Sequence, residues 1–108
     1  MIDTLQSTKK TIRPDCIPEW LEQMVETREV MRQTLGSEYD SMIAPFRAEI
    51  DAIVTEESCT PLAATRRIMS ALLDVGATYN RDENYMASQC GLAMSAGLDA
   101  TEKAEGIA

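Results

Sequence analysis

The clearest hydrophobic pattern lies between Thr60 and Gly76, where apolar residues recur at a helical period. The side-chain oxygen of Thr60 can accept a hydrogen bond from an unpaired backbone N–H at the start of a helix. Pro61 suits the first helical position, because the N–H that proline lacks would have no helical acceptor there. Gly76 suits the left-handed residue that ends many helices. The apolar residues cover more than half of the circumference: Leu62, Ile68, Met69, Leu72, Leu73 and Val75. We therefore expect a central helix around which the others pack.

A second pattern predicts a helix from about Pro18 to Leu35, which Gly36 ends. Its apolar line consists of Ile17, Leu21, Met24, Met31 and Leu35. The opposite face has an acidic stripe, which consists of Glu19, Glu22, Glu26 and Glu29. Such a stripe usually only faces solvent, but its single sign makes it a candidate contact for a partner.

Arg28 interrupts the apolar line of this helix, between Met24 and Met31. Burying an unpaired charge inside a core is unfavourable. We therefore expect the aliphatic part of the Arg28 side chain to lie along apolar surface while its guanidinium reaches water. The alternative is an ion pair with a carboxylate of a neighbouring helix or subunit. Trp20, at the edge of the same face, is expected to anchor the core; an exposed Trp20 would instead mark a contact site.

Ser37 is expected to cap the next helix, with Glu38 and Asp40 in its first turn. Pro45 should kink this helix near Ile43 or break it into two, because proline removes a backbone hydrogen bond. The downstream apolar face consists of Ile43, Phe46, Ile50, Ile53 and Val54. Further acids lie mostly on the other faces: Glu49, Asp51, Glu56 and Glu57.

The last predicted helix starts at a cap, Asn80 or Asp82, and covers about 83–96 before Gly97 ends or interrupts it. It is rich in small residues: Ala87, Ser88, Cys90, Gly91, Ala93, Ser95 and Ala96. Small residues let another helix approach closely, either inside the monomer or at a homodimer seam. Gly91 and Met94 are the candidate residues for such a seam, together with Trp20 and Arg28.

These elements predict an all-α fold, a compact bundle of four helices, or five if Pro45 breaks the second. Residues 15–97 form the predicted domain, residues 1–14 a flexible arm and residues 98–108 a frayed acidic tail. The chain has one Trp, three Tyr and one Phe, so the core must be aliphatic. Its seven Met residues make that core adaptable in shape.

Candidate chemistry is sparse. The chain has no His, which removes the commonest general base and the commonest transition-metal ligand. Cys16, Cys59 and Cys90 are odd in number and lack zinc-site spacing, so we expect reduced thiols in a cytoplasmic protein. No apolar run reaches transmembrane length. We therefore expect no catalytic activity, cofactor, metal or membrane association.

The net charge of −8 argues against direct nucleic-acid binding, which requires a basic surface. Our first hypothesis is a non-enzymatic adaptor or inhibitor that binds a larger protein through a helical face, with homodimerisation as a secondary one. One alternative is an acidic mimic of nucleic acid, which requires the acidic stripe to join Glu49, Glu56 and Glu57 in one patch. Another is a bundle that encloses a small apolar ligand between Met-lined helices.

Overall fold

A computed structural model describes residues 17–106, and within this range the chain is all-α. The predicted arm at residues 1–14 and Cys16 lie outside the described residues, and so does the side chain of Trp20. The four described helices are α2 (Ile17–Leu35), α3 (Glu38–Glu57), α4 (Pro61–Tyr79) and α5 (Glu83–Ala104). This confirms the predicted compact helical bundle.

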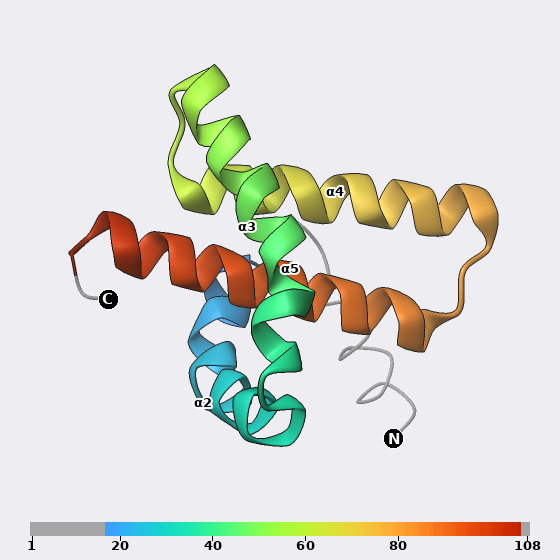
Figure 1. Cartoon of the computed structure of the whole chain (residues 1–108). Helices are drawn as coiled ribbons and strands as arrows, with labels where there is room; N and C mark the ends of the chain where they lie inside the picture. The colour runs from blue at the N-terminus through green and yellow to red at the C-terminus, as the bar shows by residue number, and fades with distance from the viewer. Residues whose placement is uncertain (1–16, 107–108) are drawn as a thin grey trace.

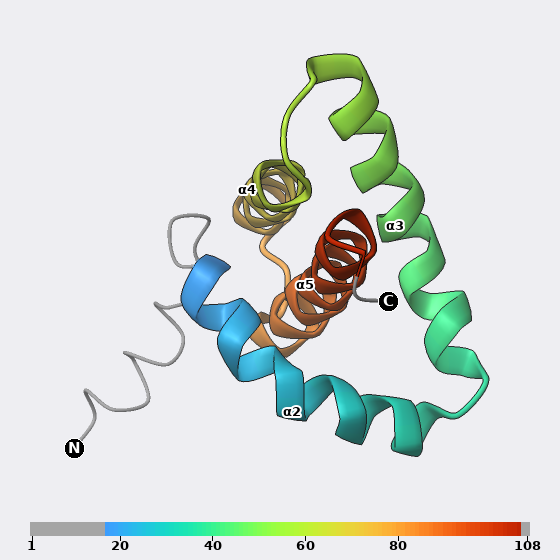
Figure 2. The ribbon, with the colours of Figure 1, turned by 90° about the vertical axis from the view of Figure 1, so that its left-hand side faces the viewer.

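Helices α4 and α5 form an antiparallel hairpin, which α3 crosses on one side (Figure 1). Viewed along the hairpin, α5 lies between the start of α2 and the middle of α3 (Figure 2). All four described helices contact one another, but α5 makes the most extensive contacts with the other three. The central helix is therefore α5, and the prediction that gave this place to the helix starting at Thr60 was wrong.

The small side chains of α5 explain its central position. Six consecutive residues of α5 are buried: Leu92, Ala93, Met94, Ser95, Ala96 and Gly97. A Cβ atom at Gly97 would overlap Oγ1 of Thr65 and lie 2.8 Å from its Cγ2, so α4 and α5 cross at a point where only glycine fits. Small residues let helix axes approach closely, and α5 can therefore be packed on several sides.

Helix α4 begins as predicted and ends later than predicted. Oγ1 of Thr60 accepts a hydrogen bond from the N–H of Ala63 at 3.1 Å, which confirms the N-cap. Gly76 lies inside the helix, and the left-handed residue at the end is Asn80, with φ 53°. A Cβ atom at Gly76 would lie 2.8 Å from Sδ of Met86. Gly76 therefore serves the close approach of α5 and does not end the helix.

The turn between α2 and α3 depends on Gly36, which has φ 59° and ends α2 as predicted. The expected cap at Ser37 was wrong. Ser37 has helical dihedral angles and makes no side-chain capping hydrogen bond. Instead the carbonyl of Gly36 accepts a hydrogen bond from the N–H of Tyr39 at 3.1 Å.

Helix α3 is continuous from Glu38 to Glu57 with Pro45 inside it, so the predicted break is not observed. Proline leaves the carbonyl four residues earlier without its helical donor, and here that carbonyl belongs to Ser41. Both Ser41 and Pro45 are exposed. Water can therefore hydrate the Ser41 carbonyl, which reduces the cost of a proline in the helix interior.

Helix α5 starts as predicted, because the carboxylate of Asp82 accepts a hydrogen bond from the N–H of Asn84 at 3.0 Å. It continues through Gly97 to Ala104. The predicted helix end at Gly97 was therefore wrong, and residues 98–104 are an ordered part of the bundle.

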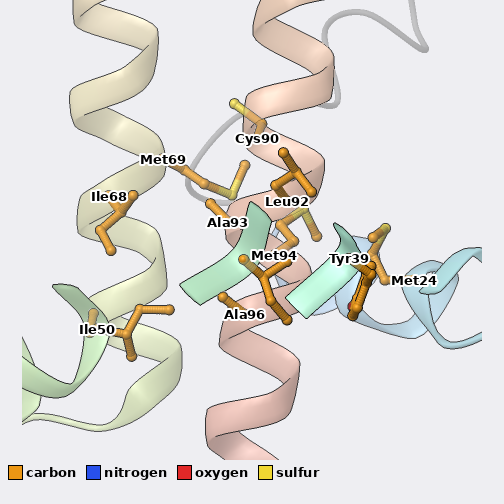
Figure 3. Close-up of a cluster of buried hydrophobic side chains, with 12 residues drawn as sticks. Met24, Tyr39, Ile50, Ile68, Met69, Cys90, Leu92, Ala93, Met94 and Ala96 are labelled. Carbon is orange, nitrogen blue, oxygen red and sulfur yellow. The ribbon is translucent and has the colours of Figure 1, made fainter. Parts of the chain in front are cut away.

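The core is aliphatic and rich in methionine, as expected (Figure 3). Its largest fully buried apolar or aromatic side chains are Tyr39, Ile43, Ile50, Met69 and Met94. Tyr39 and Met24 lie on the side of α5 away from α4, whereas Met69 lies between the two (Figure 3). Among the described helices, none is long and apolar enough to cross a membrane.

Candidate functional site

Arg28 lies at the centre of an ion-pair cluster between α2 and α5. Its guanidinium forks onto Glu102, with Nη1–Oε1 at 3.1 Å and Nη2–Oε2 at 3.0 Å, and Nη1 also donates to Oδ1 of Asp99 at 2.7 Å. Arg28 is only 8% exposed. The expectation that its head reaches water was wrong, and the alternative of a carboxylate from a neighbouring helix is confirmed.

Asp99 joins three helices through this cluster. Besides its contact with Arg28, Oδ1 of Asp99 lies 3.6 Å from Nη2 of Arg32 in α2, and Oδ2 lies 3.7 Å from Nε of Arg47 in α3. Burial opposes the charge of Arg28, but the hydrogen bonds that it donates to Glu102 and the charges of both acids outweigh this effect and raise the pKa of Arg28 above its usual value. The sequence pattern identified Arg28 as an exception on its apolar face. It did not predict the partners Asp99 and Glu102, because they lie in residues 98–108, which were expected to be frayed.

A pocket of about 370 Å³, lined mainly by charged residues, opens beside the ion-pair cluster. Its lining consists of Arg32, Asp40, Arg47, Asp51, Asp99, Ala100, Glu102 and Lys103. Several of these charges already face opposite charges, as Arg47 does with Asp40 at 3.4 Å. The described residues contain no group of three acids or cysteines placed to hold a metal ion. We interpret this network as structural.

The acidic face of α2 (Glu19, Glu22, Glu26 and Glu29) is exposed along its whole length, as predicted. The opposite side of the helix buries Met24 and Arg28. Two further exposed residues border the glutamates, one along each edge: Val25 is 54% exposed and Val30 is 61% exposed. The face therefore combines one-signed charge with exposed apolar side chains.

The α3 acids Glu49, Glu56 and Glu57 are also exposed. The α3 end that carries Glu56 and Glu57 lies at the opposite end of the molecule from α2 (Figures 1 and 2). Glu57 also forms an ion pair with Arg67 of α4. The structure thus leaves Glu56 and Glu57 apart from the acidic face of α2, although the mimic hypothesis requires one patch.

Three of the residues proposed for a dimer seam, Met94, Gly91 and Arg28, do not form a common exposed surface. Met94 is 1% exposed and lies in the core. Gly91 is half-buried, and a Cβ atom there would meet nothing within 4 Å. Arg28 is paired within its own chain. The small residues of α5 therefore serve packing inside the monomer, mainly at Gly97.

The described thiols have structural surroundings. Cys90 is buried, and burial raises its pKa from 9.0 to about 11. Cys59 is half-buried, with its Sγ 3.8 Å from the carbonyl oxygen of Ile53. Nucleophilic cysteines require a lowered pKa, so Cys90 is unsuited to that chemistry.

The free end of the α4–α5 hairpin exposes aromatic side chains. Tyr79 is 70% exposed and Tyr85 is 43% exposed, and the guanidinium of Arg81 lies 4.9 Å from the ring centroid of Tyr85. Val75 of α4 is 41% exposed. The sequence pattern did not predict this surface, because the helix was expected to end at Gly76, before Tyr79.

Comparisons of this chain with protein-family models, curated proteins and solved structures found no match.

Proposed function

We propose that this chain is a non-enzymatic interaction module, an adaptor or inhibitor, that binds a basic surface of a larger protein through the acidic face of α2. The observation that carries the proposal is the exposure of Val25 and Val30, each more than half exposed, along the two edges of four glutamates. Exposed acids attract a basic partner and accelerate its association. The valines supply apolar area that is buried on contact.

The position of α2 supports this role. Met24 and the Arg28 ion pairs hold the helix against α5, so the opposite face is presented on a fixed element. A matching partner would offer a groove or helix with aliphatic residues between lysines or arginines. The odd number and wide spacing of the cysteines in the sequence support a cytoplasmic location for this module.

Charge reversal in two places tests the proposal. The Glu22→Lys/Glu26→Lys variant changes the acidic face of α2, and the Glu49→Lys/Glu56→Lys variant makes the same change of charge on α3. Proteins retained by the immobilised wild-type chain from a lysate of its native cells are identified by mass spectrometry. Dissociation constants of a purified candidate are then measured by calorimetry for all three chains. We expect the α2 variant to lose at least tenfold in affinity and the α3 variant to bind like wild type.

The valines provide a second arm of the test. Val25→Ser/Val30→Ser removes apolar area without changing charge, and we expect faster dissociation with an almost unchanged association rate. Equal binding by the α2 charge variant and wild type would refute the proposal. Equal losses in the α2 and α3 charge variants would also refute it, because binding would then depend on total negative charge and not on the acidic face of α2.

A further inference from the structure

The outer face of α2 has features that reduce the stability of the helix within its own chain. Glu22 and Glu26 are four residues apart and Glu29 follows three residues later, so like charges lie beside one another on successive turns. Val25 and Val30 are β-branched and more than half exposed, so they lower helix propensity while most of their surface stays outside the core. Local departures of this kind, without a gain inside the chain, are typical of functional positions.

The chain places little positive charge beside this face. Oε1 of Glu29 lies 3.8 Å from Nη1 of Arg32. Among the residues that the structure describes, no cation lies within ion-pair distance of Glu19, Glu22 or Glu26. A positively charged partner would therefore relieve repulsion that the chain itself leaves in place, and positive charge is the first requirement on that partner.

The spacing of the glutamates specifies the shape of the partner. The stripe consists of Glu19, Glu22, Glu26 and Glu29, which are separated by three, four and three residues. They extend over about 15 Å of the helix axis, at about 1.5 Å per residue. A second α-helix with cations at the same spacing has the same rise and keeps each cation opposite a glutamate. In an extended strand, side chains on one face are about 6.6 Å apart, so its cations move out of step with the glutamates.

The same spacing sets the angle between the two helices. The three-four alternation has a period of about 3.5 residues, slightly less than the roughly 3.6 residues of one turn, so the stripe winds slowly around α2 in the left-handed sense. A second helix follows the stripe when the two axes cross at about 20°, a common angle for packed helices. Val25 and Val30 then lie on the two sides of the contact line, where they can contact aliphatic side chains that flank the cations of the partner.

We propose that the acidic face of α2 binds a basic amphipathic helix that lies along α2, with its cations opposite the glutamates and its aliphatic side chains beside Val25 and Val30. This inference rests on the proposed function, because it names the structural class of the partner bound there. Met24 and Arg28 hold the opposite side of α2 in the bundle, so the bundle presents this face without rearrangement.

Two synthetic peptides of identical composition test this proposal on the full chain. Both have four lysines among leucine and alanine residues, and circular dichroism checks that both are helical to the same extent. The first peptide has its lysines at three-four-three spacing, and the second distributes them around the helix. Fluorescence anisotropy of the labelled peptides measures their dissociation constants. We expect the first peptide to bind at least fivefold more tightly, because only its lysines can all face the glutamates at once.

Two further comparisons test the location of the contact and the helical form of the partner. Glu22→Lys/Glu26→Lys should weaken binding of the first peptide at least tenfold. Glu49→Lys/Glu56→Lys makes the same change of charge on α3 and should bind this peptide within about twofold of wild type. A third peptide has two prolines in place of central alanines, so it keeps the lysines but cannot form the helix. It should bind at least fivefold more weakly than the first.

Four results would overturn the proposal. Equal affinity for the two helical peptides means that only total charge is recognised, and equal affinity for the proline peptide means that the face binds an extended segment. Unchanged affinity in Glu22→Lys/Glu26→Lys means that the first peptide binds elsewhere. Absence of binding at millimolar chain concentration means that a basic helix is not the partner. The proposed function is tested separately, by the affinity of the α2 and α3 charge variants for the native partner.

Discussion

At the scale of single residues, a substitution of Arg28 tests how much the ion-pair cluster contributes to stability. We expect Arg28→Ala to lower the free energy of unfolding by about 2–4 kcal/mol, because Asp99 and Glu102 lose the cation that offsets their desolvation. Solvent reduces the loss, since these two side chains are 17% and 26% exposed. Urea denaturation followed by circular dichroism measures the change.

The control for this prediction is Arg67→Ala, which removes an exposed ion pair with Glu57. Exposed pairs contribute less than about 1 kcal/mol, so this variant should remain close to wild type. Equal losses in the two variants would show that burial does not distinguish the Arg28 cluster.

Gly97 and Gly91 make a matched pair on α5. An alanine Cβ at Gly97 would overlap Thr65, whose Oγ1 is held by a 2.8 Å hydrogen bond to the carbonyl of Pro61. We expect Gly97→Ala to cost about 1–3 kcal/mol through overpacking. Gly91 has open space at the same position. Gly91→Ala should therefore stabilise the helix by up to about 1 kcal/mol.

Thermal denaturation of both glycine variants measures these opposite shifts. A higher melting temperature for Gly97→Ala than for wild type would mean that α4 and α5 are not in close contact there.

At the scale of helices, the two predicted caps behave differently. Oγ1 of Thr60 accepts a hydrogen bond from the first turn of α4, so Thr60→Ala should cost about 1 kcal/mol. Ser37 makes no capping hydrogen bond, so Ser37→Ala should change stability by less than about 0.5 kcal/mol. Chemical denaturation of the two variants compares them directly, and equal costs would contradict the assignment of the caps.

The helix ends show where local patterns are ambiguous. Periodicity predicted every described helix, but glycine suits both a left-handed helix end and a close helix contact. Gly36 has the first role, and Gly76 and Gly97 have the second. Residues near each glycine in the sequence do not distinguish these roles, because the deciding contact comes from a different helix.

At the scale of the whole molecule, burial of Cys90 predicts a loss of stability at alkaline pH. Its pKa rises from 9.0 in the unfolded chain to about 11 in the folded one. Between these values the unfolded state loses the thiol proton while the folded state keeps it, so the free energy of unfolding falls as pH rises from 9 to 11. The contribution of this thiol reaches about 2–3 kcal/mol.

Urea denaturation at several pH values between 8 and 11 measures this loss, and Cys90→Ala is the comparison. The variant should lose less stability than wild type over the same range. Burial also raises the pKa of Tyr39, so part of the alkaline loss should remain in the variant. Identical pH profiles for the two chains would contradict the prediction for Cys90.

The candidate surfaces could be predicted only in part. Helical spacing was enough to place Glu19, Glu22, Glu26 and Glu29 on one exposed face, because that face lies opposite the buried side of the same helix. Val25 and Val30 were detectable at the edges of the stripe, since their positions follow from the same spacing. The exposed side chains at the free end of the α4–α5 hairpin, Val75, Tyr79 and Tyr85, required the tertiary structure, because they come from two different helices.

The sequence by itself determined the helical class, the starts of α4 and α5, and the exposure of the α2 acids. All of these depend on interactions within a few residues of the chain or on the period of one helix. Only the tertiary structure decided that α5 is central, that Arg28 pairs with Asp99 and Glu102, and that Gly76 and Gly97 allow close contacts. These features depend on residues far apart in sequence, and the spacing of apolar residues does not specify which helices meet.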